Sequence, residues 1–122
     1  MTDELFETGD RVRREVLGDA HVDRGGPEFA GPFRDYITRT AWGQVWSRPG
    51  LDRRTRSCVT IAVLAALHCE GELVLHVAGA LRNGVTPEEI QEVLLQTAVY
   101  AGAPAANAAF AIAARVIAEQ SP

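Results

Sequence analysis

His76 is the residue whose type and setting best suit proton transfer. It stands in the apolar segment Leu73–Ala80, and Glu72 precedes it by four residues. Residues four apart on a helix lie on the same face. A carboxylate at that position can orient an imidazole and raise its pKa, which suits a general acid. The same spacing also fits a core histidine with one hydrogen bond, or an exposed pair.

The two cysteines point to neither metal nor redox chemistry. A zinc site needs three or four ligands, and Cys69, His76 and Glu72 match no trusted metal spacing. Cys58 lies eleven residues before Cys69, and the chain has no Cys-x-x-Cys motif. We therefore predict no metal site and interpret both cysteines as small buried apolar groups.

Aromatic and cationic side chains gather between Trp42 and Arg48. Trp42, Trp46 and Arg48 could form a pocket wall with a guanidinium fork for an anion. The alternative is a pair of core aromatic residues with a surface arginine. Arg54 belongs to a cluster at the start of a helix, where positive charge opposes the helix dipole. Such a cluster needs acidic side chains or an acidic ligand.

Tyr100 and Asn107 bound a segment that is otherwise made of Gly, Ala and Pro. They are its only side chains with hydrogen-bonding groups. They could bind a ligand or could satisfy the junction between two helices.

Helices must position these residues, because nineteen alanines and long runs of helix formers dominate the chain. No alternating β-branched pattern predicts a sheet. A helix that is apolar from Cys58 to Leu67 apart from Thr60 should be buried on most sides, and subunit contacts could supply the cover. We predict an all-α bundle of five to six helices, with these features: a helix Thr2–Leu17 ended by Gly18, a loop Asp19–Pro32, a helix Phe33–Trp46, an N-cap at Asp52, a helix ending near Asn83, a capping box at Thr86 with Glu89, a stop at Gly102, and a last helix from Pro104.

Length and charge exclude several classes of protein. The chain has 122 residues, which predicts a single domain spanning residues 1–122. Twelve arginines, no lysine and sixteen acidic residues give a net charge of −4, which disfavours binding to nucleic acid or an anionic membrane. No apolar run is long enough to span a bilayer, and no apolar leader follows Met1. We predict a cytoplasmic, reduced protein.

Several segments of the sequence, taken together and in order, resemble the carboxymuconolactone decarboxylase family. The resemblance covers most of residues 11–118, and each segment is weak by itself. The resembling segments are Arg14–Asp23, Phe33–Gly50, Leu51–Ser57, Leu75–Val77, Ala80–Gly84 and Gln96–Phe110.

The resemblance implies an alkylhydroperoxidase D-like all-α fold that assembles into trimers or hexamers, with sites near subunit contacts. It implies decarboxylation of γ-carboxymuconolactone in protocatechuate catabolism, with no cofactor. The peroxidases of the wider superfamily carry Glu, Cys-x-x-Cys and a following His. Here Ser57 replaces that Glu and Glu72 replaces the second Cys, whereas Cys69 and His76 match. This departure favours the decarboxylase branch.

For that reaction, we expect His76 to protonate the dienolate that loss of CO₂ leaves behind. We expect Glu72 to orient the imidazole of His76. Arg48, with Arg39 or Arg54, binds the carboxylates of a small dicarboxylate lactone, and Trp42 or Trp46 provides an apolar wall. Tyr100 or Asn107 donates a hydrogen bond to the lactone oxygen. Three alternatives stay open: a thiol peroxidase acting through Cys69, a decarboxylase or isomerase of a related lactone, and a non-enzymatic oligomeric scaffold.

Overall fold

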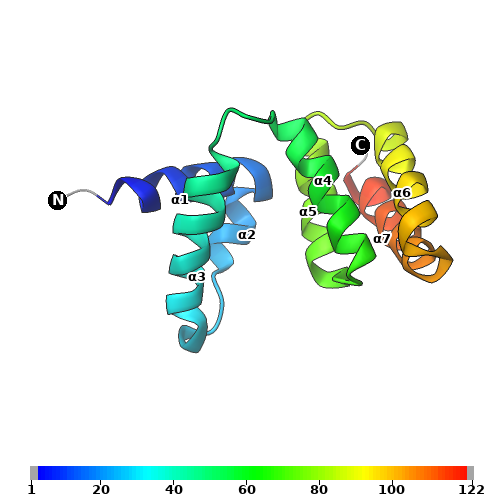
Figure 1. Cartoon of the computed structure of the whole chain (residues 1–122). Coiled ribbons are helices and arrows are strands. Elements are labelled where there is room, and N and C mark those ends of the chain that lie inside the picture. The colour runs from blue at the N-terminus through cyan, green and yellow to red at the C-terminus, as the bar shows by residue number, and fades with distance from the viewer. Residues whose placement is uncertain (1–2, 121–122) are drawn as a thin grey trace. The chain divides into compact units, whose positions relative to one another are not determined.

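The computed structural model describes residues 3–120, and every regular element in that range is helical (Figure 1). The chain forms two compact units, one ending at Asp52 and the other beginning at Arg53. The all-α prediction is confirmed for the described range, but five to six helices was too few. The first unit contains α1 (Glu4–Leu17), α2 (Asp19–Arg24), the 3₁₀ turn η1 (Glu28–Ala30), α3 (Gly31–Ile37) and the π-helix η2 (Thr38–Trp46). The second contains α4 (Arg53–Ala66), α5 (Glu70–Arg82), α6 (Pro87–Ala101) and α7 (Ala103–Gln120).

The first unit is built on the packing of α1 against η2. Gly9 and Gly43 are buried where the two helices meet. A Cβ at Gly9 would overlap the carbonyl oxygen of Thr38, and one at Gly43 would lie 2.5 Å from the carbonyl oxygen of Leu5. Both positions therefore require glycine for close approach of the two backbones.

The predicted loop Asp19–Pro32 is wrong for most of its length, because it holds α2, η1 and the start of α3. Arg14 on α1 holds α2 in place through Asp19 and Asp23, at 3.2 and 2.7 Å. Val22 on α2 is buried. These contacts stabilise a short helix that the glycine before it and the Gly25-Gly26-Pro27 run after it concealed.

The helix predicted over Phe33–Trp46 is present, but it begins at Gly31 and widens into a π-helix after Ile37. Three hydroxyl side chains in this stretch donate to the carbonyl of the residue four positions earlier, including Thr38 to Arg34 and Ser47 to Gly43. Such bonds compete with the regular helical ladder. The first helix ends at Gly18 as predicted and begins at Glu4 after an Asp3 N-cap, whereas Thr2 lies outside the described residues.

The second unit is a four-helix bundle in which α4, α5, α7 and α6 contact one another in that cyclic order. Its core draws apolar side chains from all four helices: Ile61, Leu73, Val77, Ile90, Leu94, Ile112 and Val116 are representative. Short-range signals locate its helix ends correctly. The capping box of Thr86 and Glu89 is present, Gly102 ends α6, and α7 starts one residue before Pro104.

α4 is less buried than its apolar sequence predicts. Only Ser57, Ile61 and Ala65 of this helix are buried in the chain. Val59 and Val63 are each about half exposed. Asp52 directly precedes the helix, which agrees with the position predicted for its N-cap. No helix among residues 3–120 combines the length and the hydropathy that a membrane crossing requires.

Candidate functional site

His76 lies on the core-facing side of α5. It is 8% exposed, and its Nδ1 atom is fully buried. Leu73, Val77 and Ala80, which share this face, belong to the hydrophobic core of the bundle. A nearly desolvated imidazole can transfer a proton without competition from bulk water. The burial is equally what the core-histidine alternative requires.

Glu72 lies one helical turn before His76, and its side chain is exposed to solvent. The structure therefore gives the predicted spacing on α5 but places one partner at the surface and the other in the core. The pairing of Glu72 with His76 stays a prediction.

Ser57 and Asn83 form a part-buried polar pair that the sequence did not predict. Ser57 on α4 is fully buried, and its Oγ accepts a hydrogen bond of 2.9 Å from Asn83 Nδ2. Asn83 caps the C-terminus of α5, two helical turns after His76. The pair ties α4 to α5 within a largely apolar interface. A serine at the edge of an apolar helix was the available signal for it.

Arg54 is engaged within the bundle. Its guanidinium donates to the carbonyl oxygen of Gly84 and to the carboxylate of Glu89. The backbone N–H of Thr86 and the Arg54 guanidinium together lower the pKa of Glu89. Arg54 thus links the start of α4 to the capping box of α6. Glu89 is thus the acidic partner of Arg54, while a contact of Arg54 with a substrate stays a prediction.

Tyr100 and Asn107 lie on different helices, and both are exposed. Tyr100, on α6, lines a groove between α4 and α6 together with Gln96 and Thr97. Asn107 lies in the first half of α7. Their roles as hydrogen-bond donors to a ligand stay predictions.

Trp42 and Trp46 stack on each other in η2, with ring centroids 4.9 Å apart and an interplanar angle of 25°. Trp42 is buried, and Trp46 is half-buried. Arg48 follows in the exposed turn after the helix. The burial of Trp42 fits the alternative of a core aromatic residue, and a pocket wall formed with Trp46 and Arg48 stays a prediction.

Arg39 already holds a carboxylate. Its Nε and Nη2 atoms donate to Asp3 at 2.9 and 2.5 Å, and its guanidinium lies 5.2 Å from the ring centre of Phe6. Arg39 holds the pKa of the Asp3 carboxyl below its usual range, with help from the backbone N–H of Phe6. A substrate carboxylate would have to share or displace Asp3.

The predicted residues fall on both units. The tryptophans, Arg39 and Arg48 belong to the first unit, whereas the second carries the other five: Glu72, His76, Arg54, Tyr100 and Asn107.

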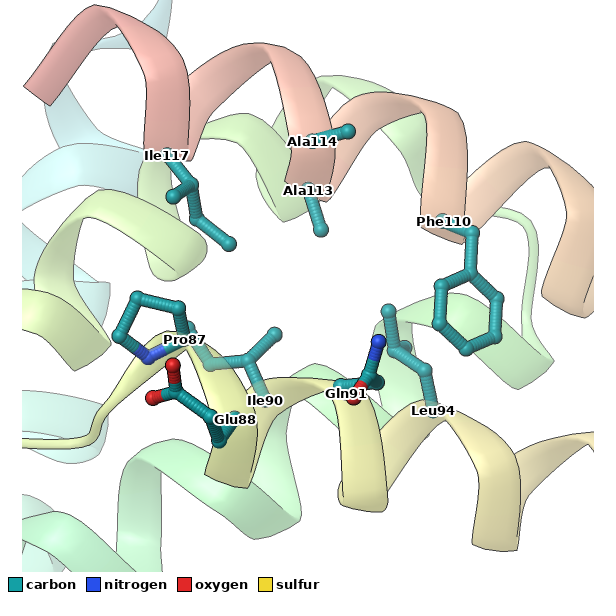
Figure 2. A pocket seen from close by; sticks show the side chains of 9 residues that line it. All are labelled: Pro87, Glu88, Ile90, Gln91, Leu94, Phe110, Ala113, Ala114 and Ile117. Carbon is teal, nitrogen blue, oxygen red and sulfur yellow. The ribbon is translucent and has the colours of Figure 1, made fainter. Parts of the chain in front are cut away.

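The second unit has an apolar cavity and an apolar groove, and neither suits the dicarboxylate lactone that the resemblance implies. A cavity of about 220 Å³ lies between α6 and α7, with Glu88 and Gln91 as its polar lining residues. Figure 2 shows the side chains of these two helices facing each other across it. The groove between α4 and α6 measures about 660 Å³, and Glu92 is its one charged lining residue. Neither lining includes a cation, so neither hollow can pair with carboxylates. Among residues 3–120, no group of three His, Cys, Asp or Glu side chains is placed to hold a metal ion.

Residues 3–120 define an all-helical protein with a buried histidine on α5 and a stacked tryptophan pair that precedes an exposed arginine. The model of the carboxymuconolactone decarboxylase family matches residues 31–115. The chain therefore belongs to the carboxymuconolactone decarboxylase family.

The chain is similar to several curated proteins. It is 50% identical over 120 residues to 4-carboxymuconolactone decarboxylase of Acinetobacter baylyi. The aligned region covers 95% of this chain and 90% of that protein. It is 42% identical over 116 residues to nitrosuccinic acid decarboxylase of Metarhizium robertsii, covering 93% and 81%. A third relative, 4-carboxymuconolactone decarboxylase of Pseudomonas putida, is 51% identical over 41 residues, covering 31% of this chain and 85% of that sequence.

Proposed function

We propose that this chain is a carboxy-lyase that converts 4-carboxymuconolactone (γ-carboxymuconolactone) into the β-ketoadipate enol-lactone. The observation that carries the proposal is the 50% identity, over 95% of the chain, to a protein with that activity in its name. The family match and the buried histidine on α5 support it.

The chemistry of this substrate requires no cofactor. The carboxylate that leaves is bonded to a ring carbon conjugated, through the C=C bond, with the lactone carbonyl. When the C–CO₂ bond breaks, its electron pair moves through the C=C bond onto the carbonyl oxygen of the lactone. The product of this step is a dienolate. A proton then adds at the α-carbon, which gives the enol-lactone. The protein has to hold the dianion, stabilise the oxygen charge and supply the proton.

We assign the proton transfer to His76. The imidazolium gives its proton to the α-carbon, becomes neutral and regains a proton from water. Its position at the edge of an apolar core suits a donor that meets one reactive carbon. Glu72 orients the imidazole in this proposal.

The carboxylates require cations, which the first unit supplies best. Arg48 lies two residues after Trp46, in an exposed turn, so its guanidinium is accessible to a ligand. Arg39, which contacts Asp3, and Arg54, which contacts Glu89, are the secondary candidates. An apolar wall at Trp42 or Trp46 favours loss of the departing carboxylate as neutral CO₂. Tyr100 or Asn107 donates to the lactone oxygen.

A second substrate is favoured by the relative that is 42% identical and named nitrosuccinic acid decarboxylase. A nitro group also accepts the electron pair that CO₂ leaves behind, so the same needs recur: a held dicarboxylate and a proton for carbon. The peroxidase alternative has less support, because Glu72 occupies the position of the second cysteine.

A competition assay tests the proposal. Purified protein is given 4-carboxymuconolactone or nitrosuccinate, and kcat/KM for CO₂ release is measured for each. We expect the lactone to be preferred by at least about tenfold. In D₂O, proton NMR should show a single deuterium at the α-carbon of the enol-lactone. Preference for nitrosuccinate, or release of CO₂ without deuterium at that carbon, would overturn the assignment.

Self-association into trimers or hexamers and a cytoplasmic setting belong to the same proposal. Val59, Val63 and Tyr100 leave an apolar surface on the chain that a second copy would cover. Exposed apolar patches of this kind mark sites of protein association.

A further inference from the structure

An aromatic stripe stands out on the surface of the first unit. Phe29, Phe33 and Tyr36 are 97%, 63% and 61% exposed. Phe33 and Tyr36 share one face of α3, and Phe29 precedes them on the 3₁₀ turn η1. Neither η1 nor α3 has a buried residue. The stripe is therefore a row of anchors without cover in the single chain.

A groove of matching chemistry lies on the second unit, between α4 (green in Figure 1) and α6 (yellow). Val59 and Val63 form one wall, and Val93, Thr97 and Tyr100 form the other. Val59 is 51% and Tyr100 is 83% exposed, so the groove is open. Grooves of this kind bind helical segments that present a row of apolar side chains.

We propose that the Phe29–Phe33–Tyr36 stripe of one copy docks into the α4–α6 groove of a second copy. This inference rests on the self-association proposed above and names the two faces that make it. The contact is head-to-tail, because the stripe and the groove are different surfaces. Repeated around a closed ring, it gives every copy one filled groove and one covered stripe.

The charges favour this occupant over others. Glu92 is the one charged residue that lines the groove, and α3 carries both Arg34 and Asp35 between Phe33 and Tyr36. A docked stripe therefore adds no net charge to the groove. The groove offers no cation for an anionic lipid, a nucleic acid or a dicarboxylate, so those ligands are disfavoured.

The buried area agrees with a ring rather than an isolated pair. Buried aromatic side chains contribute about 150–250 Å² each. We multiply the area of each stripe side chain by its exposed fraction and count an equal area on the groove. One contact then buries roughly 700–1,100 Å² in total. Stable interfaces begin at about 1,200 Å². One contact is therefore weak and forms only at high protein concentration, whereas a closed ring gives each copy two.

The contact also reaches the candidate site. Tyr100 is a proposed donor to the lactone oxygen, and it lines the groove. In the assembled protein, α3 of the neighbouring copy would form a wall beside Tyr100.

Complementation between two variants tests the proposal. Phe33→Asp breaks the stripe and keeps the groove, whereas Val63→Asp breaks the groove and keeps the stripe. Each is examined alone and in an equal mixture by sedimentation velocity and native mass spectrometry at high protein concentration. We expect each variant alone to be a monomer. The mixture should form a 1:1 dimer of twice that mass, because one intact stripe meets one intact groove.

Leu95→Asp serves as the matched control, because Leu95 is a half-exposed apolar residue of α6 outside the groove lining. It should keep the mass of the wild-type assembly, and far-UV circular dichroism verifies that each variant is folded. A wild-type assembly that survives Phe33→Asp, or a mixture that fails to pair, overturns the proposed faces alone. A monomeric wild type overturns self-association itself, while the decarboxylase assay stands independently.

Discussion

At the scale of residues, burial separates the two histidines of the second unit. His76 faces the core, and His68 is exposed after α4. The sequence already indicated this for His76, because apolar neighbours at helical spacing surround it. The sequence did not reveal that Arg39 and Arg54 are engaged with Asp3 and Glu89, because those contacts join residues 36 and 35 positions apart.

His76→Ala should lower kcat by about 10²–10⁴, the usual contribution of general acid–base catalysis. His68→Asn is the matched control, because His68 has a left-handed backbone (φ 58°) that asparagine tolerates. Steady-state kinetics and thermal unfolding are measured for both variants. A folded His76→Ala protein with kcat within a few-fold of wild type would exclude His76 as the acid.

Arg48→Gln should raise KM for the lactone about 10- to 100-fold while changing kcat less, since a charge-assisted hydrogen bond contributes about 1.5–3 kcal/mol. Arg11→Gln, at an exposed position outside the proposed site, should leave KM unchanged. Both tryptophans of the chain lie in the stack before Arg48, so titration with a substrate analogue can be followed by their fluorescence. An unchanged KM would place carboxylate binding elsewhere.

At the scale of elements, local signals predicted helix ends well and helix type poorly. The Thr86 capping box and Gly102 act through neighbouring residues, so they are legible in the sequence. The helix α2 depends on Arg14 of α1. The widening of η2 accompanies the close approach of two helices through Gly9 and Gly43. Such tertiary causes leave no periodic pattern.

Gly9→Ala should destabilise the first unit by about 1–3 kcal/mol, because the added methyl group would overlap the Thr38 carbonyl. Gly71→Ala, on the open side of α5 with no atom within 4 Å of the new Cβ, should be neutral or slightly stabilising. Tryptophan fluorescence reports on the first unit during urea unfolding. Equal midpoints for Gly9→Ala and wild type would refute the close packing.

Glu89→Gln tests the link between α4 and α6 through pH. The folded-state pKa of Glu89 is lowered, so its stabilising contribution is complete above its ordinary value near 4.5 and is lost as the pH falls through the lower folded-state value. At pH 7 the variant should unfold at a lower temperature than wild type, and the difference should shrink below about pH 4.5. Glu88→Gln shares the helix terminus without the capping bonds and should show a smaller difference. A gap independent of pH would contradict the assigned contacts.

At the scale of the whole molecule, helix content and family were legible in the sequence, whereas the division into two units was not. Composition and ordered motifs depend on local residue choice. The division depends on which helices contact which, and the nine candidate side chains are shared between the units. The apolar surface of α4 shows the same point, because an all-round apolar pattern indicates that cover is needed without indicating which chain supplies it.

The most direct test of the central claim is CO₂ release from 4-carboxymuconolactone by the purified protein after treatment with a chelator and without added cofactor. Rapid multiple-turnover release, with the enol-lactone as product, is the predicted result. A folded, assembled protein that releases no CO₂ above the uncatalysed rate, or that requires a metal to do so, would contradict the account.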